Sequence, residues 1–308
     1  MYYLRADKWE KEALATTKNQ KLGDIGKIEL NMSNFANASM KSDRPRLLHD
    51  GLLPIADTTE AEFGLQGALA AVPPLEPTQA LLDELAAVSA SLESASPQDI
   101  LKWAVDRFAE RFTMATAFGP EGMTIIHMLA EIAPKTPIFN LDTGYQFPET
   151  LALREKIKER YGIEVELKRP ALSVEEYERI NGGPVYKEEP HRCCADRKIA
   201  VLREAARGMY AWASAIRRDQ SPDRSIAPIV GWDKKFQLVK VSPLANWTKK
   251  QVWGLITSKD IPYNPMHDLG YTSIGCWPCT RAVSIGEDER AGRWSGTAKT
   301  ECGLHTQD

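Results

Sequence analysis

Hydrophobic positions change their spacing repeatedly between residues 78 and 256, and each change marks a new predicted element. Short apolar runs rich in β-branched and aromatic residues predict strands at 111–118, 137–141, 163–168, 211–216 and 236–241. Apolar residues at helical spacing predict helices at 78–92, 97–108, 123–132, 148–161, 173–180 and 195–207, and a further helix begins at Thr248. Alternation of this kind is typical of parallel sheets with right-handed crossovers, so we predict an α/β fold with a doubly wound, mostly parallel sheet.

Two of the predicted strands end in residues that suit a nucleotide site. Phe118-Gly119 follows the first strand, and Asp142-Thr143-Gly144 follows the second. Open parallel sheets bind ligands beyond the carboxyl ends of their strands, so the two segments together favour a nucleotide cleft. Simpler readings stay open for each, because Gly119 and Gly122 also fit an ordinary strand-to-helix turn and Asp142 also fits a turn cap.

Residues 1–78 read differently from the rest of the chain. They show no sustained hydrophobic period and end in a proline-rich connector at 71–77. We interpret them as an N-terminal extension of unknown role, with one short strand expected at 27–31. The α/β domain is predicted to occupy residues 79–286.

Composition and charge limit the classes of partner. With 308 residues, 43% of them hydrophobic, the chain can build a full core, and a net charge of −3 gives no general attraction to nucleic acid. No run approaches the roughly 20 apolar residues that cross a bilayer. An anionic ligand therefore needs a local group of cations, and Arg281, Arg290, Arg293 and Lys299 supply one, although such a stretch is also typical of a solvated surface.

The five cysteines form two pairs and a singleton, which suits four metal ligands plus one reactive thiol. The pairs are Cys193-Cys194 and Cys276/Cys279, and the singleton is Cys302. Only the second pair has the C-x-x-C spacing that zinc favours, whereas adjacent cysteines can reach two corners of a cubane, so the pattern favours a [4Fe–4S] cluster. Zinc, or buried or disulfide-bonded cysteines, remain the alternatives. Because we see no signal peptide, we expect a cytoplasmic protein with reduced thiols.

Further short segments are distributed over residues 96–308. They are 116–119, 141–144, 147–150, 193–198, 217–221, 274–281, 292–294 and Glu301-Cys302-Gly303-Leu304-His305. In these segments the chain closely resembles the assimilatory adenylylsulfate reductases of the phosphoadenylylsulfate reductase family. The resemblance implies an adenine-nucleotide α-hydrolase-like fold and the reduction of adenylylsulfate, or its 3′-phosphorylated form, to sulfite.

The resemblance also implies a cofactor and a partner. The branch of the family with both cysteine pairs holds a [4Fe–4S] cluster and mostly uses adenylylsulfate, and all four cysteines are present here. Thioredoxin is the implied reductant. Since no thioredoxin-like domain follows Cys302, we expect thioredoxin to be a separate protein.

The family match assigns roles to individual residues. Cys302 is implied to be the nucleophile, on a mobile C-terminal tail at 287–308, with His305 stabilising its thiolate. The implied ligands of phosphate and sulfate oxygens are Lys198, Arg224, Arg290, Arg293 and, as a weaker candidate, Arg217. The implied adenosine pocket comprises Phe118, Gly119, Leu141, Asp142 and Thr143. The implied cluster ligands are Cys193, Cys194, Cys276 and Cys279.

Three other functions compete with this interpretation. The first is a phosphoadenylylsulfate reductase that retains the cluster, and the second is a zinc-bound nucleotide-binding module without catalysis. The third is an ATP-dependent sulfur transferase acting on RNA, which needs a Ser-Gly-Gly pyrophosphate loop that this sequence lacks. No sequence feature decides whether the chain forms a homo-oligomer.

Overall fold

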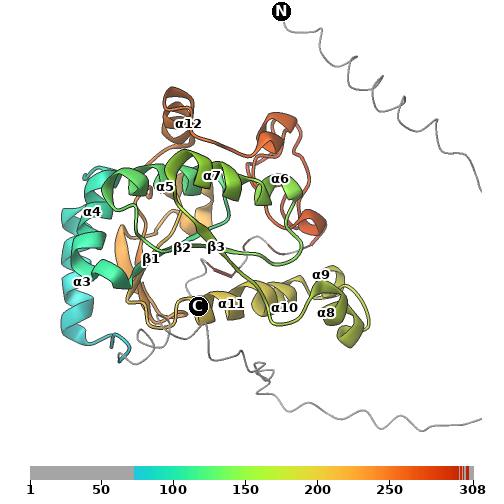
Figure 1. The fold of residues 1–308 in the computed structure, drawn as a ribbon, viewed down its shortest axis with the longest axis horizontal. Coiled ribbons are helices and arrows are strands. Elements are labelled where there is room, and N and C mark those ends of the chain that lie inside the picture. Colours follow the sequence, from blue (N-terminus) through green and yellow to red (C-terminus); the bar gives the residue numbers. More distant parts are fainter. Residues whose placement is uncertain (1–72, 298, 300, 302, 305–308) are drawn as a thin grey trace, which may run out of the picture. The chain divides into compact units, whose positions relative to one another are not determined.

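The computed structural model describes residues 73–297, 299, 301, 303 and 304 (Figure 1). The strand expected at 27–31 and the candidate residues Cys302 and His305 lie outside these residues. Six strands form one sheet in the order β3-β2-β1-β4-β6-β5. Their bounds are β1 Phe112–Thr116, β2 Ile138–Leu141, β3 Val165–Lys168, β4 Ala211–Ala213, β5 Val230–Asp233 and β6 Leu238–Val241. All neighbouring pairs are parallel except β5 and β6.

Helices cover both faces of the sheet, with α4, α5 and α7 on one side and α10 and α11 on the other (Figure 1). The helices before β3 are α3 Gln79–Ser91, α4 Pro97–Phe108, α5 Pro120–Ile132, α6 Pro148–Leu151 and α7 Leu153–Tyr161. Those after it are α8 Val174–Asn181, α9 Val185–Glu188, α10 Pro190–Cys194, α11 Ala200–Ala205 and α12 Lys249–Ser258. Within the described residues, no helix has the length and apolar character that a bilayer-spanning segment needs.

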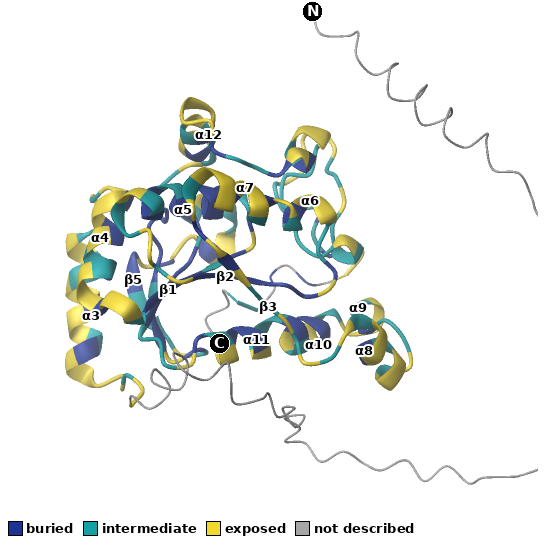
Figure 2. Cartoon of the chain, viewed as in Figure 1, coloured by how far each residue is buried: buried dark blue, intermediate teal, exposed yellow. Residues whose placement is uncertain are grey.

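Local sequence signals set several helix ends. The side chains of Thr78 and Ser96 accept hydrogen bonds from backbone N–H groups at the starts of α3 and α4. Gly162 ends α7 in the left-handed conformation, at φ +66°. Each of these helices has a buried face and an exposed face (Figure 2), as expected for amphipathic helices that pack on a sheet.

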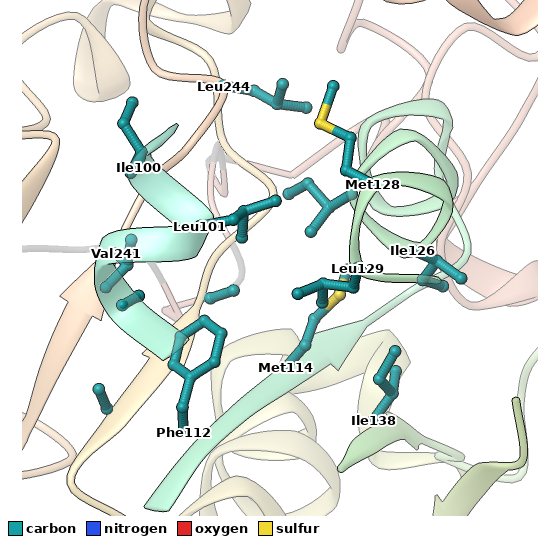
Figure 3. Close-up of a cluster of buried hydrophobic side chains, with 14 of the residues drawn as sticks. Ile100, Leu101, Phe112, Met114, Ile126, Met128, Leu129, Ile138, Val241 and Leu244 are labelled. Atoms are coloured by element: carbon teal, nitrogen blue, oxygen red, sulfur yellow. The ribbon is translucent and has the colours of Figure 1, made fainter. Parts of the chain in front are cut away.

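Alternation along each strand divides the apolar core between the two faces of the sheet. Ile138 belongs to the larger cluster, whereas its neighbour Phe139 belongs to a second cluster. In the larger cluster, Leu101 of α4, Met114 of β1 and Leu129 of α5 pack together with no more than traces of exposed surface (Figure 3). The second cluster packs α11 against the opposite face.

The structure confirms the predicted fold class and the five strands predicted between residues 111 and 241, and it differs in several details. Strand β5 was not predicted, and the helix expected at 148–161 is divided into α6 and α7 at Ala152. The helix predicted over 195–207 begins earlier, so the cysteine pair before that range is already helical. Cys193 and Cys194 lie at the end of α10, which continues through a π-helical segment, η3 (Ala195–Ile199), into α11.

Candidate active site

An open cleft lies at the carboxyl edge of the sheet, where β1 and β4 are neighbours and the strand order changes direction. In doubly wound sheets this switch point is where ligands bind. Thr116 and Gly119 at the end of β1, Leu141 at the end of β2 and Ala215 after β4 line its floor. A cleft is therefore present at the position that the sequence predicts for a nucleotide site.

The four predicted ligand cysteines line one small cavity beside the cleft. Cys193 and Cys194 are buried on α10, and Cys276 precedes and Cys279 ends a single 3₁₀ turn, η7 (Trp277–Cys279). Within the described part of the chain, no three His, Cys, Asp or Glu side chains are grouped closely enough to hold one metal ion. The cysteines thus surround the cavity from two chain segments without converging on one point.

Three residues line both the cleft and the cysteine cavity: Lys198, Cys276 and Arg293. Lys198 comes from the π-helical segment, and Arg293 packs above the ring of Trp294, with its guanidinium carbon 4.4 Å from the ring centroid. Glycine at position 275 leaves room for the Arg293 guanidinium, because a Cβ atom there would collide with it. A ligand in the cleft would therefore share cationic side chains with whatever occupies the cysteine cavity.

The segment after β2 holds the Cys276 loop in place. Oγ1 of Thr143 lies 3.2 Å from Sγ of Cys276, and the N–H of Trp277 donates to the carbonyl of Tyr145 at 2.8 Å. Gln146 and Cys276 also form an isolated antiparallel bridge. Thr143, predicted to line the adenosine pocket, instead lines the cysteine cavity.

Arg197 fastens this segment to the cysteine helix. Its side chain is buried between the rings of Tyr145 and Tyr177, 5.5 and 5.1 Å from their centroids, and its Nε donates to the carbonyl of Thr143 at 2.6 Å. A π-helical turn shifts side-chain directions relative to a regular α-helix. In this chain that turn carries Arg197 into the interior and Lys198 to the cleft.

Burial and charge act in opposite directions on the thiols. Burial, followed by the neighbouring thiols, raises the pKa of Cys193 to about 12, and the same two influences raise the pKa of Cys279. Burial alone would also raise the pKa of Cys276, but Lys198, the Thr143 hydroxyl and Arg293 outweigh it and lower that pKa. Lys198 and Arg293 therefore favour thiolate at Cys276, which among the described cysteines is the one that lines the cleft.

Cations gather at the end of the cleft nearest the cysteines. Arg224 from the 3₁₀ turn η5 (Pro222–Arg224), Arg290, Arg293 and Lys198 all line it. Nε of Arg293 is buried without a hydrogen-bond partner, although its Nη1 donates to Ser273 Oγ at 3.3 Å. Unsatisfied buried donors are rare in folded proteins, so this one indicates a place for an anionic ligand.

Three further cleft residues carry buried polar atoms without hydrogen-bond partners: Oδ1 of Asn140, Oε1 of Gln146 and Nε2 of His267. Burial lowers the pKa of His267, so its imidazole is neutral at neutral pH. Such groups suit the hydroxyl and amino groups of a nucleoside. Sequence reasoning missed all three, because no local motif marks them.

Besides Thr143, three residues predicted to bind substrate are not among the described residues that line the cleft. Phe118 has φ +57°, which turns its side chain into the main core, where it is 1% exposed. Asp142 caps the next turn by accepting from the N–H of Gly144 at 3.0 Å, and it pairs with Arg169 at 2.8 Å. These contacts agree with the simpler interpretation, in which Asp142 caps a turn.

Arg217 is the third, and it forms the centre of a buried ion-pair network. Its side chain is 1% exposed and contacts Glu121, Asp219 at 2.8 Å and Glu289 at 3.5 Å. These carboxylates occupy its guanidinium, so the weaker assignment of Arg217 to substrate is not supported by its contacts. The remaining predicted cations and Gly119 and Leu141 do line the cleft.

Replacing Arg217 by methionine should lower stability rather than affect ligand binding selectively. The variant leaves Glu121 and Glu289 without their buried cation, which costs about 3–5 kcal/mol in free energy of unfolding. Urea titration measures this loss. The control is Arg281→Met, which breaks an exposed pair with Glu287 and should leave the urea midpoint nearly unchanged. Unchanged stability with lost nucleotide binding would contradict the structural role.

Comparison with known proteins places the chain. Residues 111–282 match the model of the phosphoadenosine phosphosulfate reductase domain. A protein of Gloeobacter violaceus named phosphoadenosine 5′-phosphosulfate reductase is 44% identical over 69% of this chain and 90% of its own length. Adenosine 5′-phosphosulfate reductases of Salinibacter ruber and Bacillus subtilis are 43% and 44% identical over 72% and 67% of this chain, and over 88% and 89% of their own lengths.

A solved structure agrees with these sequence matches. The phosphoadenylyl-sulfate reductase of Candida auris, determined as a phosphate complex, superposes with a TM-score of 0.59 and 28% identity. The superposition covers 68% of this chain and all of the other. The chain therefore belongs to the phosphoadenosine phosphosulfate reductase family.

Proposed function

We propose that this protein is an adenylylsulfate reductase that converts adenylylsulfate to sulfite and AMP in the cytoplasm, with thioredoxin as the reductant. Relatives over two thirds of the chain bear the name of this activity. The observation that carries the proposal is the wall shared by the cleft and the cysteine cavity, formed by Lys198, Cys276 and Arg293. At the edge of the sheet where ligands bind, this wall connects a group of cations that can bind an anion with a cavity lined by four thiols.

The cleft suits a nucleotide that carries a phosphate and a sulfate. Guanidinium and ammonium groups bind such oxygens through charge-assisted hydrogen bonds, and Arg290, Arg293 and Lys198 line one end of the cleft. The unpaired acceptors Asn140 Oδ1 and Gln146 Oε1 are available to the nucleoside. The same cations would stabilise AMP as it leaves, because negative charge grows on its phosphate.

The proposed chemistry has two steps. The Cys302 thiolate attacks the sulfur of the sulfate group, so that an S–S bond forms, the S–O bond to the phosphate breaks and AMP leaves. A thioredoxin thiolate then attacks the Cys302 sulfur, and sulfite leaves with the electron pair of the S–S bond. The second thioredoxin thiol releases Cys302, so two thiols are oxidised to a disulfide as sulfur is reduced from the sulfate to the sulfite state. His305 is proposed to stabilise the Cys302 thiolate.

Cys193, Cys194, Cys276 and Cys279 would hold a [4Fe–4S] cluster. The donor set fits, since four thiols line one cavity and Thr143 offers a polar contact to the Cys276 sulfur. When bound, the cluster would shape the electrostatic field beside the sulfate without cycling its redox state, because dithiols supply the electrons. The residues of this chain perform the remaining tasks of binding, orientation and attack.

A competition assay tests the choice of substrate. With thioredoxin present, we expect kcat/KM to be higher for adenylylsulfate than for its 3′-phosphorylated form, measured with both nucleotides in one mixture. The second candidate, a phosphoadenylylsulfate reductase that retains the cluster, is favoured by the name of the Gloeobacter relative. A higher kcat/KM for the 3′-phosphorylated nucleotide would establish that candidate in place of ours.

A further inference from the structure

A carboxylate from the C-terminal segment lies inside the cationic end of the cleft. Oε2 of Glu301 accepts hydrogen bonds from Nε and Nη2 of Arg224 at 2.9 and 2.7 Å. Its Oε1 accepts from Nη2 of Arg290 at 3.2 Å. Both cations are among the residues proposed to bind substrate, and Glu301 itself lines the cleft.

Because this network is buried, it holds Glu301 firmly in position. The Glu301 side chain is 4% exposed and that of Arg224 is 8% exposed. A buried carboxylate is tolerated only while it is paired, so Glu301 keeps its place as long as the two arginines hold it. Two Arg224 donors converge on Oε2 while Arg290 holds Oε1, so the two oxygens are bound by different arginines and the carboxylate direction is fixed.

Neighbouring described residues are held by other elements. Nζ of Lys299 donates to the carbonyl of Pro190, at the start of α10, and Nζ of Lys235 donates to the carbonyl of Gly303, both at 2.9 Å. Leu304 packs against the apolar cluster that includes Val201 and Phe236. Residues 299, 301, 303 and 304 are therefore each held by contacts with other elements.

We propose that Glu301 is a positioning residue for the nucleophile. By its ion pairs with Arg224 and Arg290 it anchors the chain at the cleft, so that the cysteine next to it meets the bound sulfate at a fixed distance. This inference rests on the proposed function. The Glu301 carboxylate also repels the negatively charged substrate. The anchor therefore speeds the transfer of the sulfonate group to the cysteine but weakens nucleotide binding.

The variant Glu301→Gln separates these two effects, because it keeps the shape and one acceptor while losing the charge. We expect AMP to bind with unchanged or lower Kd in calorimetry. In a single turnover without thioredoxin, we expect S-sulfonate to form at least about tenfold more slowly, since loss of orientation weakens attack. Hydrogen exchange in the C-terminal peptide 299–304 should become faster. The matched control is Glu287→Gln, in an exposed pair with Arg281, which should leave all three measurements unchanged.

The outcomes distinguish the proposal from a purely structural role. Wild-type rates of S-sulfonate formation in Glu301→Gln would overturn it. A tenfold or greater loss of AMP binding would also overturn it, because Glu301 would then merely hold the arginines in shape. If the wild-type protein forms no S-sulfonate, the proposed function fails, and hydrogen exchange decides alone: faster exchange in Glu301→Gln supports the anchor and equal exchange contradicts it.

Discussion

Cys302→Ser is expected to abolish sulfite release, with turnover lower by at least about a thousandfold, while AMP still binds. A serine hydroxyl is not ionised at neutral pH and is a far weaker nucleophile than a thiolate. The cleft cations are other side chains that the substitution leaves in place, so nucleotide affinity should be retained. Sulfite production with thioredoxin and calorimetric titration with AMP provide the two measurements. A variant that keeps more than about a tenth of wild-type turnover would show that Cys302 is not the nucleophile.

Cys276→Ala is expected to remove the iron and, with it, all turnover. Cys276 lies on the wall between the two cavities, and its sulfur contacts Thr143. Loss of one ligand weakens a metal site directly, and a site formed from two separate segments also loses a link that stabilises the fold. Iron and acid-labile sulfide are counted on anaerobically prepared protein, together with the absorbance of the cluster.

The matched control for this experiment is Cys302→Ser, which removes the one cysteine that is not a proposed ligand and should keep its full iron content. Wild-type iron content in Cys276→Ala would contradict the ligand assignment. If the wild-type protein contains zinc and no iron, the four cysteines form a zinc site and the cluster assignment is wrong.

Most of the sheet is predictable because its central strands are short and largely buried. Burial on both faces gives β1 and β2 mostly apolar sequences, interrupted by Thr113, Thr116 and Asn140, which separate them from the helices. Strand β5 is different, since it carries Gly231 and Asp233 and three of its four residues are only partly buried. Its antiparallel pairing with β6 comes from the chain returning along the sheet, which no local pattern encodes.

The cysteine helix shows where local rules fail. Pro190 was available as a helix-start signal, since it stands at the first turn of α10. The continuation through a π-helical segment directs Arg197 to the carbonyl of Thr143, 54 residues away along the chain. That contact exists only in the folded structure, so no local pattern marks it.

The candidate site was predictable in its cations and cysteines but not in their partners. Lys198, Arg224, Arg290 and Arg293 stand in recognisable segments, and all four line the cleft. The sequence could not separate them from Arg217, whose acidic partners Glu121 and Glu289 are brought to it by the fold. Glu301 was visible beside Cys302, but its role becomes apparent only when Arg224 and Arg290 are seen around it.

The central claim is that the tail thiol displaces AMP from adenylylsulfate. The most direct measurement mixes the protein with adenylylsulfate in the absence of any reductant and determines the mass of the C-terminal peptide. Our account predicts that the peptide containing Cys302 gains one SO₃ group, that AMP appears in equal amount, and that thioredoxin removes the group as sulfite. A C-terminal peptide of unchanged mass, in protein that still produces sulfite once thioredoxin is added, would contradict it.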